Sequence, residues 1–325
     1  MNILLTGGAG YIGSQTTFAL IEKGHTVTVI DNLITGNLNL VPKKVKFLKA
    51  DISDETKIKA LLENDKFDIV MHFAGLVRVE ESIKDPKKYN LYNFEKAKKF
   101  FDVCINSGIK KIIFSSTAGI YGENKRMRKI NEDDELLPSN PYAKSKYELE
   151  KYLINITKEK NLSCVILRYF NVAGADKKNR TGLIAQNSNN LIKVICEVAL
   201  EKREKITING NDYKTKDGTP IRDFIHVEDL SDMHLNVAEK LKNNNQTSIY
   251  NCGYGTGYSV GEVINEMEKI LKRNLKKEYG PRRKNDIPYS VADNKKFQKK
   301  FNWMPKYNDL SYILKSALEW EKKIK

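Results

Sequence analysis

Short, continuously apolar segments alternate with helix-like segments through the first half of the chain. The apolar segments predict strands at residues 3–5, 27–30, 45–48, 69–73, 112–114 and 165–167, and helices are predicted at 14–23, 55–64, 86–106 and 141–158. Apolar strands that alternate with helices indicate a parallel sheet covered on both faces. We therefore predict a Rossmann-like, doubly wound α/β domain over residues 1–170.

The pattern changes beyond residue 171 to helices mixed with short strands. This predicts a smaller, mixed α/β substrate-binding lobe over residues 171–325, with residues 222–250 expected to return to the first domain. Ser259 and Glu262 have the spacing of a capping box and predict a helix that runs to Leu271. Ligands bind at the carboxyl ends of the strands in parallel sheets, so the residues after each strand are the first candidates for a site.

A glycine-rich turn follows the first predicted strand. Gly7, Gly10 and Gly13 have the spacing Gly-x-x-Gly-x-x-Gly, and a predicted helix comes next. Glycine allows the backbone to approach a pyrophosphate, and the helix N-terminus attracts the anion. The second strand leads into Asp31, whose carboxylate can accept both ribose hydroxyls and would repel a 2′-phosphate. No arginine lies near it in the sequence, so NAD is favoured over NADP.

Composition and charge narrow the class of protein. The chain has 325 residues, of which 40% are hydrophobic and 30% charged, as in ordinary globular proteins. It has neither a long apolar segment nor a leader, so we expect a cytoplasmic protein without membrane association. Four scattered cysteines and four dispersed histidines suggest reduced thiols and no metal site. The net charge is +15, but the lysines lack interleaved aromatic residues, so no nucleic-acid partner is expected.

Hydroxyl residues and a Tyr–Lys pair are the candidate catalytic groups. Ser115 and Thr117 follow the predicted strand at 112–114, and Tyr142 and Lys146 share one face of a predicted helix. A tyrosine with a pKa of ~10 is a poor base, but an adjacent ammonium and a positive nicotinamide ring favour the phenolate. Lowering that pKa to ~7 needs about 4 kcal/mol. We predict that Tyr142 is the base and that Thr117 shares a hydrogen bond with the substrate oxygen.

These motifs resemble the extended short-chain dehydrogenase/reductase family, and within it the UDP-hexose 4-epimerases. The resemblance runs nearly end to end and includes Asp31-Asn32, Asp51-Ile52, His72-Phe-Ala-Gly75, Ser115-Ser-Thr117, Tyr142 to Lys146, Arg168-Tyr-Phe-Asn171, Gly210-Asn-Asp-Tyr213, Arg222-Asp-Phe-Ile-His-Val227 and Pro281-Arg-Arg283. It implies that Tyr142 takes the proton of the 4-hydroxyl while hydride passes to tightly bound NAD. The transient 4-keto sugar then turns about its diphosphate, and hydride returns to the other face. UDP-glucose and UDP-galactose would thus interconvert.

The resemblance also implies two sets of site residues and a homodimer. Cofactor contacts are implied at Gly7, Gly10, Tyr11, Ile12, Gly13, Asp31, Asn32, Asp51, Ile52, Phe73, Ala74, Gly75, Asn93, Ser115, Tyr142, Lys146 and Phe170. Substrate contacts are implied at Thr117, Asn171, Asn190, Leu191, Arg222, Arg283, Asp286 and Ser290. The two arginines would hold the diphosphate and Asp286 the uridine ribose. The dimer would form through the helices near 86–106 and 141–158.

The chain departs from the family pattern at three places. Val77 stands where relatives have a lysine, and Lys96 occupies the glycine position of the usual Asn-x-x-Gly-Thr segment that begins at Asn93. Ser290 matches a position where members of narrow specificity have a large tyrosine. A serine leaves room for a 2-acetamido group, so UDP-N-acetylhexosamines are expected as further substrates. Tyr289 could fill this space if the loop shifted.

Two other functions stay open at this point. A nucleotide-sugar 4,6-dehydratase or decarboxylase of the same family is the nearest alternative. Dehydratases resemble one another in an Asp-Glu pair after the catalytic hydroxyl residue, whereas Thr117 is followed by Ala118 and Gly119. A non-catalytic NAD-binding or RNA-binding relative is the second alternative. The presence of Thr117, Tyr142 and Lys146 together argues against it.

Overall fold

The computed structural model describes residues 1–123, 127–186, 188–241, 247–283 and 286–324. The chain divides into two compact units, and we describe each by itself. Unit 1 comprises residues 1–120, 138–168 and 231–250, and unit 2 comprises residues 121–137, 169–230 and 251–325. Each unit is therefore assembled from three separate stretches of the chain. Which ligand each unit binds stays a prediction.

A seven-stranded sheet forms the centre of unit 1, with the strand order β10-β6-β5-β4-β1-β2-β3. Its strands are β1 (Asn2–Thr6), β2 (Thr26–Asp31), β3 (Lys46–Lys49), β4 (Ile69–His72), β5 (Lys111–Thr117), β6 (Ser163–Tyr169) and β10 (Thr247–Cys252). The central strand β1 pairs in parallel with β2 on one side and β4 on the other. The strand order reverses at β1, which is where ligands bind in doubly wound folds. The predicted Rossmann-like fold is confirmed.

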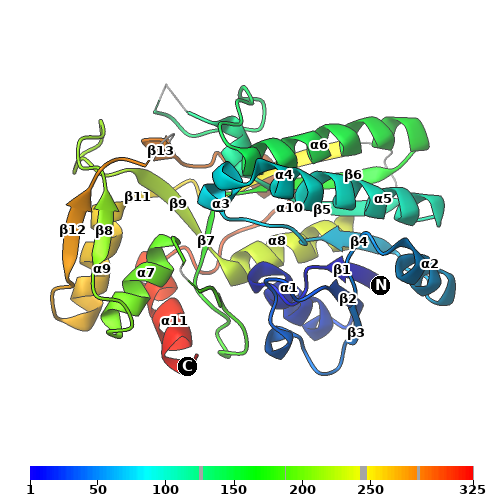
Figure 1. The fold of residues 1–325 in the computed structure, drawn as a ribbon, viewed down its shortest axis with the longest axis horizontal. Helices are drawn as coiled ribbons and strands as arrows, with labels where there is room; N and C mark the ends of the chain where they lie inside the picture. The colour runs from blue at the N-terminus through cyan, green and yellow to red at the C-terminus, as the bar shows by residue number, and fades with distance from the viewer. Residues whose placement is uncertain (124–126, 187, 242–246, 284–285, 325) are drawn as a thin grey trace. The chain divides into compact units, whose positions relative to one another are not determined.

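Helices cover both faces of this sheet (Figure 1). One layer holds α1 (Tyr11–Glu22) and α8 (Val227–Lys240), and the other holds α2 (Glu55–Asn64), α5 (Lys96–Asn106) and α6 (Pro141–Lys160). The helix predicted at 86–106 consists of α4 (Pro86–Asn90), a π-helical turn (Leu91–Glu95) and α5. The short helix α3 (Val79–Lys84) precedes it, and 3₁₀ turns occur at Leu38–Leu40 and Ala118–Tyr121.

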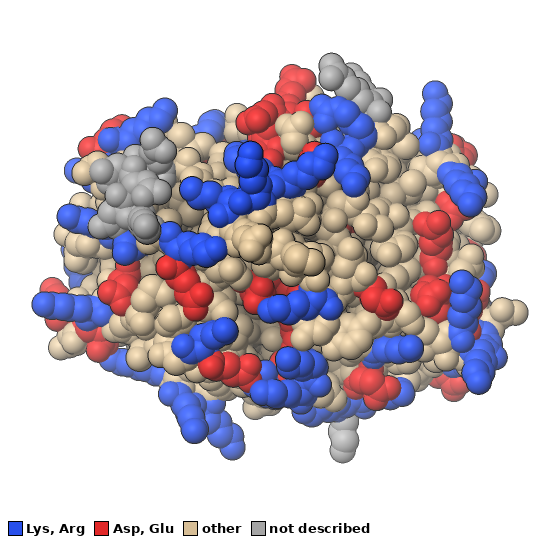
Figure 2. Space-filling model, turned by 180° about the vertical axis from the view of Figure 1, so that it is seen from behind, with Lys and Arg blue, Asp and Glu red and all other residues tan. Residues whose placement is uncertain are grey.

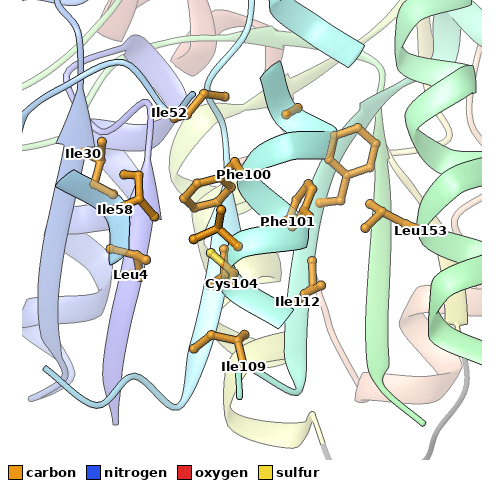
Figure 3. Packing of buried hydrophobic residues seen from close by; sticks show 14 of the residues in the cluster. Leu4, Ile30, Ile52, Ile58, Phe100, Phe101, Cys104, Ile109, Ile112 and Leu153 are labelled. Carbon is orange, nitrogen blue, oxygen red and sulfur yellow. The ribbon is translucent and has the colours of Figure 1, made fainter. Parts of the chain in front are cut away.

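One hydrophobic core joins α2, α5 and α6 to the sheet. Phe100 and Phe101 of α5 are fully buried, and they lie beside side chains from the strands and from α6 (Figure 3). Leu153 of α6 and Ile112 of β5 belong to the same cluster. Burying a side chain of this size stabilises the fold by about 1.5–3 kcal/mol. The core therefore fixes α6, which carries the predicted base, against the end of β5.

The described residues of unit 2 form two smaller sheets and the helices that flank them. The strands β7 (Asn171–Ala173), β9 (Ile221–His226), β11 (Gly257–Ser259) and β13 (Tyr289–Ser290) form a mixed sheet, and β8 (Ile206–Asn209) pairs in parallel with β12 (Lys277–Gly280). The helices are α7 (Leu191–Ala199), α9 (Val260–Leu271), α10 (Lys295–Phe301) and α11 (Leu310–Lys323). The predicted capping box is confirmed, because the Ser259 side chain accepts from the N–H of Glu262 and the Glu262 carboxylate accepts from the N–H of Ser259.

Neither the surface charge nor the cysteines identify a functional site in this protein. Lys and Arg are interspersed with Asp and Glu on the face shown in Figure 2. All four cysteines are buried, and none forms a disulfide. No helix in the described part of the chain has the length and apolar character needed to span a bilayer. Within the same residues, no three His, Cys, Asp or Glu side chains gather into a metal-binding group.

Candidate cofactor site and active site

The glycine turn between β1 and α1 is packed so closely that side chains would not fit. Gly7 has φ +74°, and a Cβ added there would lie 2.5 Å from the backbone nitrogen of Ala74. A Cβ on Gly13 would lie 2.2 Å from the carbonyl oxygen of Gly7. Gly10 is the N-cap of α1, and it has no side chain that could form a capping hydrogen bond. The turn therefore brings bare backbone to the start of a helix, as the binding of a pyrophosphate requires.

A pocket lies beside this turn, where β1, β2, β3 and β4 end. Nine predicted cofactor residues line it, namely Gly7, Gly10, Asp31, Asn32, Asp51, Ile52, Phe73, Ala74 and Gly75. Eight others do not, namely Tyr11, Ile12, Gly13, Asn93, Ser115, Tyr142, Lys146 and Phe170. Further lining residues, which were not predicted as cofactor contacts, include Thr35, Gly36, Leu76, Tyr92 and Lys96. Of these, only Lys96 belongs to a segment that the sequence analysis singled out, and it was noted there as a departure from the family pattern.

Asp31 is held at the wall of the pocket by backbone N–H groups. Its Oδ2 accepts from Ala9 N at 3.0 Å and its Oδ1 accepts from Leu33 N at 2.8 Å. Burial raises the pKa of this carboxyl, and the two N–H groups oppose that shift. A carboxylate has about four lone-pair sites, so acceptor capacity is left for the two hydroxyls of a ribose.

Lys96 and Asp51 form an ion pair on the pocket wall. The Lys96 ammonium lies 2.7 Å from Asp51 Oδ2, which also accepts from Asn32 Nδ2 at 3.1 Å, and it sits 4.1 Å from the centre of the Tyr92 ring. Burial acts to raise the pKa of Asp51, but hydrogen bonds, that of Lys96 foremost, lower it to about 2. Lys96 is the only Lys or Arg among the described lining residues. Because it is already paired with a carboxylate, the pocket suits NAD better than a cofactor with an added 2′-phosphate.

Asn93 joins the loop after β4 to the helix α6. Its Oδ1 accepts from Leu76 N at 2.7 Å, and its Nδ2 donates to Leu76 O at 2.9 Å and to Ser145 Oγ at 3.2 Å. Asn93 is buried in the π-helical turn, a local irregularity that often occurs at functional sites. Because its amide is occupied by these groups, Asn93 is placed to position the loop that lines the pocket.

Thr117, Tyr142 and Lys146 are brought together in unit 1. The Tyr142 hydroxyl is hydrogen-bonded to the Thr117 side chain, and Lys146 Nζ donates to the carbonyl oxygen of Ser115 at 3.0 Å. Burial raises the pKa of Tyr142, and the Thr117 hydrogen bond opposes this shift. Burial lowers the pKa of Lys146 to about 8, opposed by the charge of Glu150. The described protein groups alone thus leave Tyr142 neutral at pH 7, and further positive charge is needed to make it a base.

The departure at Val77 leaves a solvent-exposed side chain. Val77 is 66% exposed, and the next residue, Arg78, donates its backbone N–H to the Tyr89 hydroxyl at 2.9 Å. Tyr89 is buried, and its ring meets that of Tyr142 edge-on at 6.4 Å. The loop after β4 is thus tied to the neighbourhood of the predicted base through Tyr89, a residue that was not predicted to belong to the site.

Tyr213, Arg222 and Asp286 of unit 2 form a polar cluster, which includes two of the predicted substrate contacts. Arg222 Nη2 donates to Asp286 Oδ1 at 2.6 Å, and the Tyr213 hydroxyl donates to Asp286 Oδ2 at 3.2 Å. Burial and the neighbouring Asp286 raise the pKa of Tyr213 to about 12. Tyr213 belongs to a recognised motif but was not assigned a role. Arg283 is exposed, and its carbonyl oxygen accepts from Asp286 N at 3.2 Å.

The other predicted substrate residues lie at the starts of elements in unit 2. Asn171 begins β7 opposite Phe224 of β9, and the preceding Phe170 is buried. Asn190 is the N-cap of α7, which begins at Leu191, and its Oδ1 accepts from Lys193 N at 3.2 Å. Because this side chain caps the helix, Asn190 and Leu191 are better placed to contact a ligand through their backbone.

Ser290 is buried in the short strand β13 of unit 2. It pairs with Arg222 of β9, and Tyr289 pairs with Ile221, whose N–H donates to the carbonyl oxygen of Pro288 at 2.9 Å. Neighbouring side chains on a strand point to opposite faces of the sheet. In this register Tyr289 therefore does not share the side of the sheet occupied by Ser290.

Known proteins match the chain over almost its whole length. The model of the NAD dependent epimerase/dehydratase family matches residues 3–253. The UDP-glucose 4-epimerase of Azospirillum brasilense is 39% identical over 322 residues, which cover 99% of this chain and 92% of the relative. The UDP-glucose 4-epimerase of Stenotrophomonas maltophila, solved with bound NAD and formylated UDP-arabinopyranose, has a TM-score of 0.95 at 30% identity, covering 99% and 98% of the two chains. The UDP-Glc/GlcNAc 4-epimerase of Campylobacter jejuni has a TM-score of 0.84 at 40% identity, covering 99% of each chain.

The position of Asn93 predicts that Asn93→Ala weakens retention of the dinucleotide. The substitution leaves the N–H and carbonyl oxygen of Leu76 without this partner, and each such loss costs about 1–3 kcal/mol. We expect less cofactor absorbance after gel filtration and a lower midpoint of urea unfolding. Asn90→Ala is the control, because the Asn90 amide binds Glu95 at an exposed position. Equal cofactor retention in both variants would contradict the role given to Asn93.

Proposed function

Because the chain belongs to the NAD dependent epimerase/dehydratase family, we propose that it is a UDP-glucose 4-epimerase. It inverts C4 of the hexose and interconverts UDP-glucose and UDP-galactose. The observation that carries this function is the joint presence of Thr117, Tyr142 and Lys146 in the unit that holds the glycine turn, in a chain 39% identical to a UDP-glucose 4-epimerase. The direct test is incubation of the purified protein with UDP-galactose without added cofactor, and formation of UDP-glucose is expected.

The lining residues of the pocket in unit 1 include the groups that would hold NAD. The glycine turn would hold the pyrophosphate, and Asp31 the adenosine ribose. Asn32, Asp51 and Ile52 lie further along the same wall. NAD bound there would supply reversible hydride transfer at C4 of the sugar, with no net change in the cofactor.

The protein's own side chains transfer one proton and hold the groups that exchange it in place. Tyr142 Oη takes the proton of the 4-hydroxyl group and later returns it. The Thr117 hydroxyl, bonded to Tyr142, orients the same substrate oxygen. Lys146 supplies a positive charge that opposes protonation of the phenolate, and it is charged at pH 7 because its pKa is about 8.

The cluster in unit 2 supplies the groups that bind a nucleoside diphosphate. Arg222 uses one N–H on Asp286 and another on the carbonyl oxygen of Ile221, which leaves further donors of its guanidinium for a diphosphate. Asp286, held by Arg222 and Tyr213, would accept from the uridine ribose. Arg283, which is exposed, would add a second charge for the diphosphate.

Removal of the proton acceptor gives the clearest prediction for this mechanism. Tyr142→Phe is expected to lower kcat at least about 100-fold, the smallest usual effect of losing a general base, with retained NAD unchanged. Tyr147→Phe is the matched control, because Tyr147 lies on the same helix and contacts Lys151 through its ring. Turnover of Tyr142→Phe at the rate of the unmodified enzyme would contradict the mechanism.

The small, buried side chain of Ser290 supports a broad sugar specificity. We propose that UDP-GlcNAc and UDP-GalNAc are substrates as well, since a serine leaves space where a tyrosine would not. The relative from Campylobacter jejuni, 40% identical, is a UDP-Glc/GlcNAc 4-epimerase. The register of β13 supports the same conclusion, because it directs Tyr289 to the opposite face.

The specificity proposal predicts a selective effect of Ser290→Tyr. We expect the ratio of kcat/KM for UDP-GalNAc to that for UDP-galactose to fall by about 10-fold or more, since a clash in a packed site costs about 1–3 kcal/mol. Ser290→Ala is the control and should leave the ratio unchanged. Absence of N-acetyl activity in the unmodified enzyme, or an unchanged ratio in Ser290→Tyr, would refute the proposal.

We also propose a cytoplasmic homodimer that serves galactose metabolism. Leu149 and Leu153, which lie in the helix expected near 141–158 at the interface, are buried in the core of unit 1, so they do not provide the contact. Exposed apolar side chains are instead present at Val79, Ile83 and Leu91, in α3 and the π-helical turn, which pack on α6. Sedimentation at micromolar concentration should show a dimer, and a single species of 37.3 kDa would contradict it.

A further inference from the structure

A buried glutamate extends the catalytic face of α6. Glu150 follows Tyr142 by eight residues and Lys146 by four, so the three side chains share one face of the helix. Glu150 is fully buried. The proposed chemistry gives it no role, although a buried carboxylate is costly unless its charge is paired and hydrogen-bonded.

The Glu150 carboxylate is held by residues of two neighbouring strands. Arg168 of β6 donates from Nε to Oε1 at 3.2 Å and from Nη2 to Oε2 at 2.8 Å. Ser116 of β5 donates a short hydrogen bond to Oε1. Arg168 and Ser116 are themselves at most 2% exposed. This two-point contact between guanidinium and carboxylate ties the middle of α6 to β5 and β6 with a defined geometry.

Stability alone is a weak reason for this arrangement. Buried ion pairs often contribute no more to stability than well-packed apolar side chains of the same size. The charge of Glu150, however, lies one helical turn from Lys146, on the inner face of the same helix. A negative charge at this position favours the ammonium form of Lys146 and opposes the effect of burial.

We propose that Glu150 is a positioning residue that keeps Lys146 positively charged and holds the catalytic face of α6 against β5 and β6. Arg168 and Ser116 fix the carboxylate in place for this task. The effect on turnover rests on the proposed function, whereas the charge of Lys146 is a property of the fold and can be measured without substrate.

The other groups around Lys146 do not replace the charge of Glu150. The ring of Phe114 lies 5.0 Å from Lys146 Nζ, and the Ser115 carbonyl accepts its hydrogen bond. His72 of β4 and Glu150 of α6 interact electrostatically with Lys146. Cys164 and Arg168 of β6 interact with Glu150, and Tyr89 of α4 contacts Tyr142. Burial lowers the pKa of His72 and raises those of Cys164, Tyr89 and Tyr142, so these four are neutral at pH 7. Among these groups, only Glu150 carries a negative charge.

The direct test follows the titration of Lys146 by NMR. Protein labelled with carbon-13 at the lysine ε position reports each amine, and Lys146→Arg identifies the resonance. In the unmodified protein the pKa of Lys146 is expected at about 8. Glu150→Gln should lower it by about one pH unit or more, because an opposite charge at close range has been removed. Glu148→Gln is the control on the same helix, where Glu148 pairs with Lys151 at the surface, and should change nothing.

The pH profile of enzyme activity provides a second test, and the direction of the expected shift is defined. Loss of the Lys146 proton removes the charge that supports the phenolate, so activity falls as pH rises through the pKa of Lys146. In Glu150→Gln the alkaline limb of the pH profile of kcat should move to lower pH. The size of this shift should equal the decrease in the pKa of Lys146 seen by NMR. Glu150→Asp keeps the charge and should keep the limb near its original position, even if the shorter side chain lowers kcat. A purely structural role would lower kcat in both variants without moving the limb.

A double variant keeps the proposal testable if Glu150→Gln alone does not fold. Glu150→Gln with Arg168→Gln removes both charges and leaves no unpaired buried cation. The pKa of Lys146 should still fall, by less than in the single variant. An unchanged pKa in either folded variant would overturn the proposal. If the pKa falls but the unmodified protein does not epimerise UDP-galactose, the proposed function is wrong and the role of Glu150 in the charge of Lys146 stands.

Discussion

The docking of α6 on β5 is the contact on which the proposed chemistry depends. Leu149 and Leu153 anchor the helix in the hydrophobic core, and Lys146 donates to the carbonyl of Ser115 at the end of the strand. The hydrogen bond between Tyr142 and Thr117 exists only because the helix and the strand meet at this depth. A small shift of α6 would separate donor from acceptor while leaving the rest of unit 1 folded.

The regular part of the fold could be predicted from local patterns. The central strands are apolar through their middle residues because both faces of the sheet are covered, and the predicted strands therefore lie close to the observed ones. Helix α2 and the capping box at Ser259 were predicted with their observed limits, because polar side chains near their first residues define where they begin. The π-helical turn was missed, because the residues from Leu91 to Glu95 have no composition that distinguishes them from the α-helix on either side.

The sites could be predicted only as far as they follow motifs. The glycine turn and the residues after β2 and β4 line one pocket, as the strand ends require. Lys96 was identified only as a departure from a pattern, and its partner Asp51 lies 45 residues away in the sequence. Tyr213 and Asp286 are likewise joined only by the fold. The pKa of Tyr142 could not be foreseen either, because the effect of burial depends on packing that the sequence does not display.

The way the chain is shared between the units limits how the protein can be divided. A truncated chain ending near residue 170 would include the glycine turn and α6 but not β10, which pairs with β6 at the margin of the large sheet. The backbone groups of β6 would then face solvent along an open edge, a surface that promotes association of one sheet with another. Residues 1–170 are consequently not a portable module, because a later stretch of the chain completes the large sheet and belongs to unit 1.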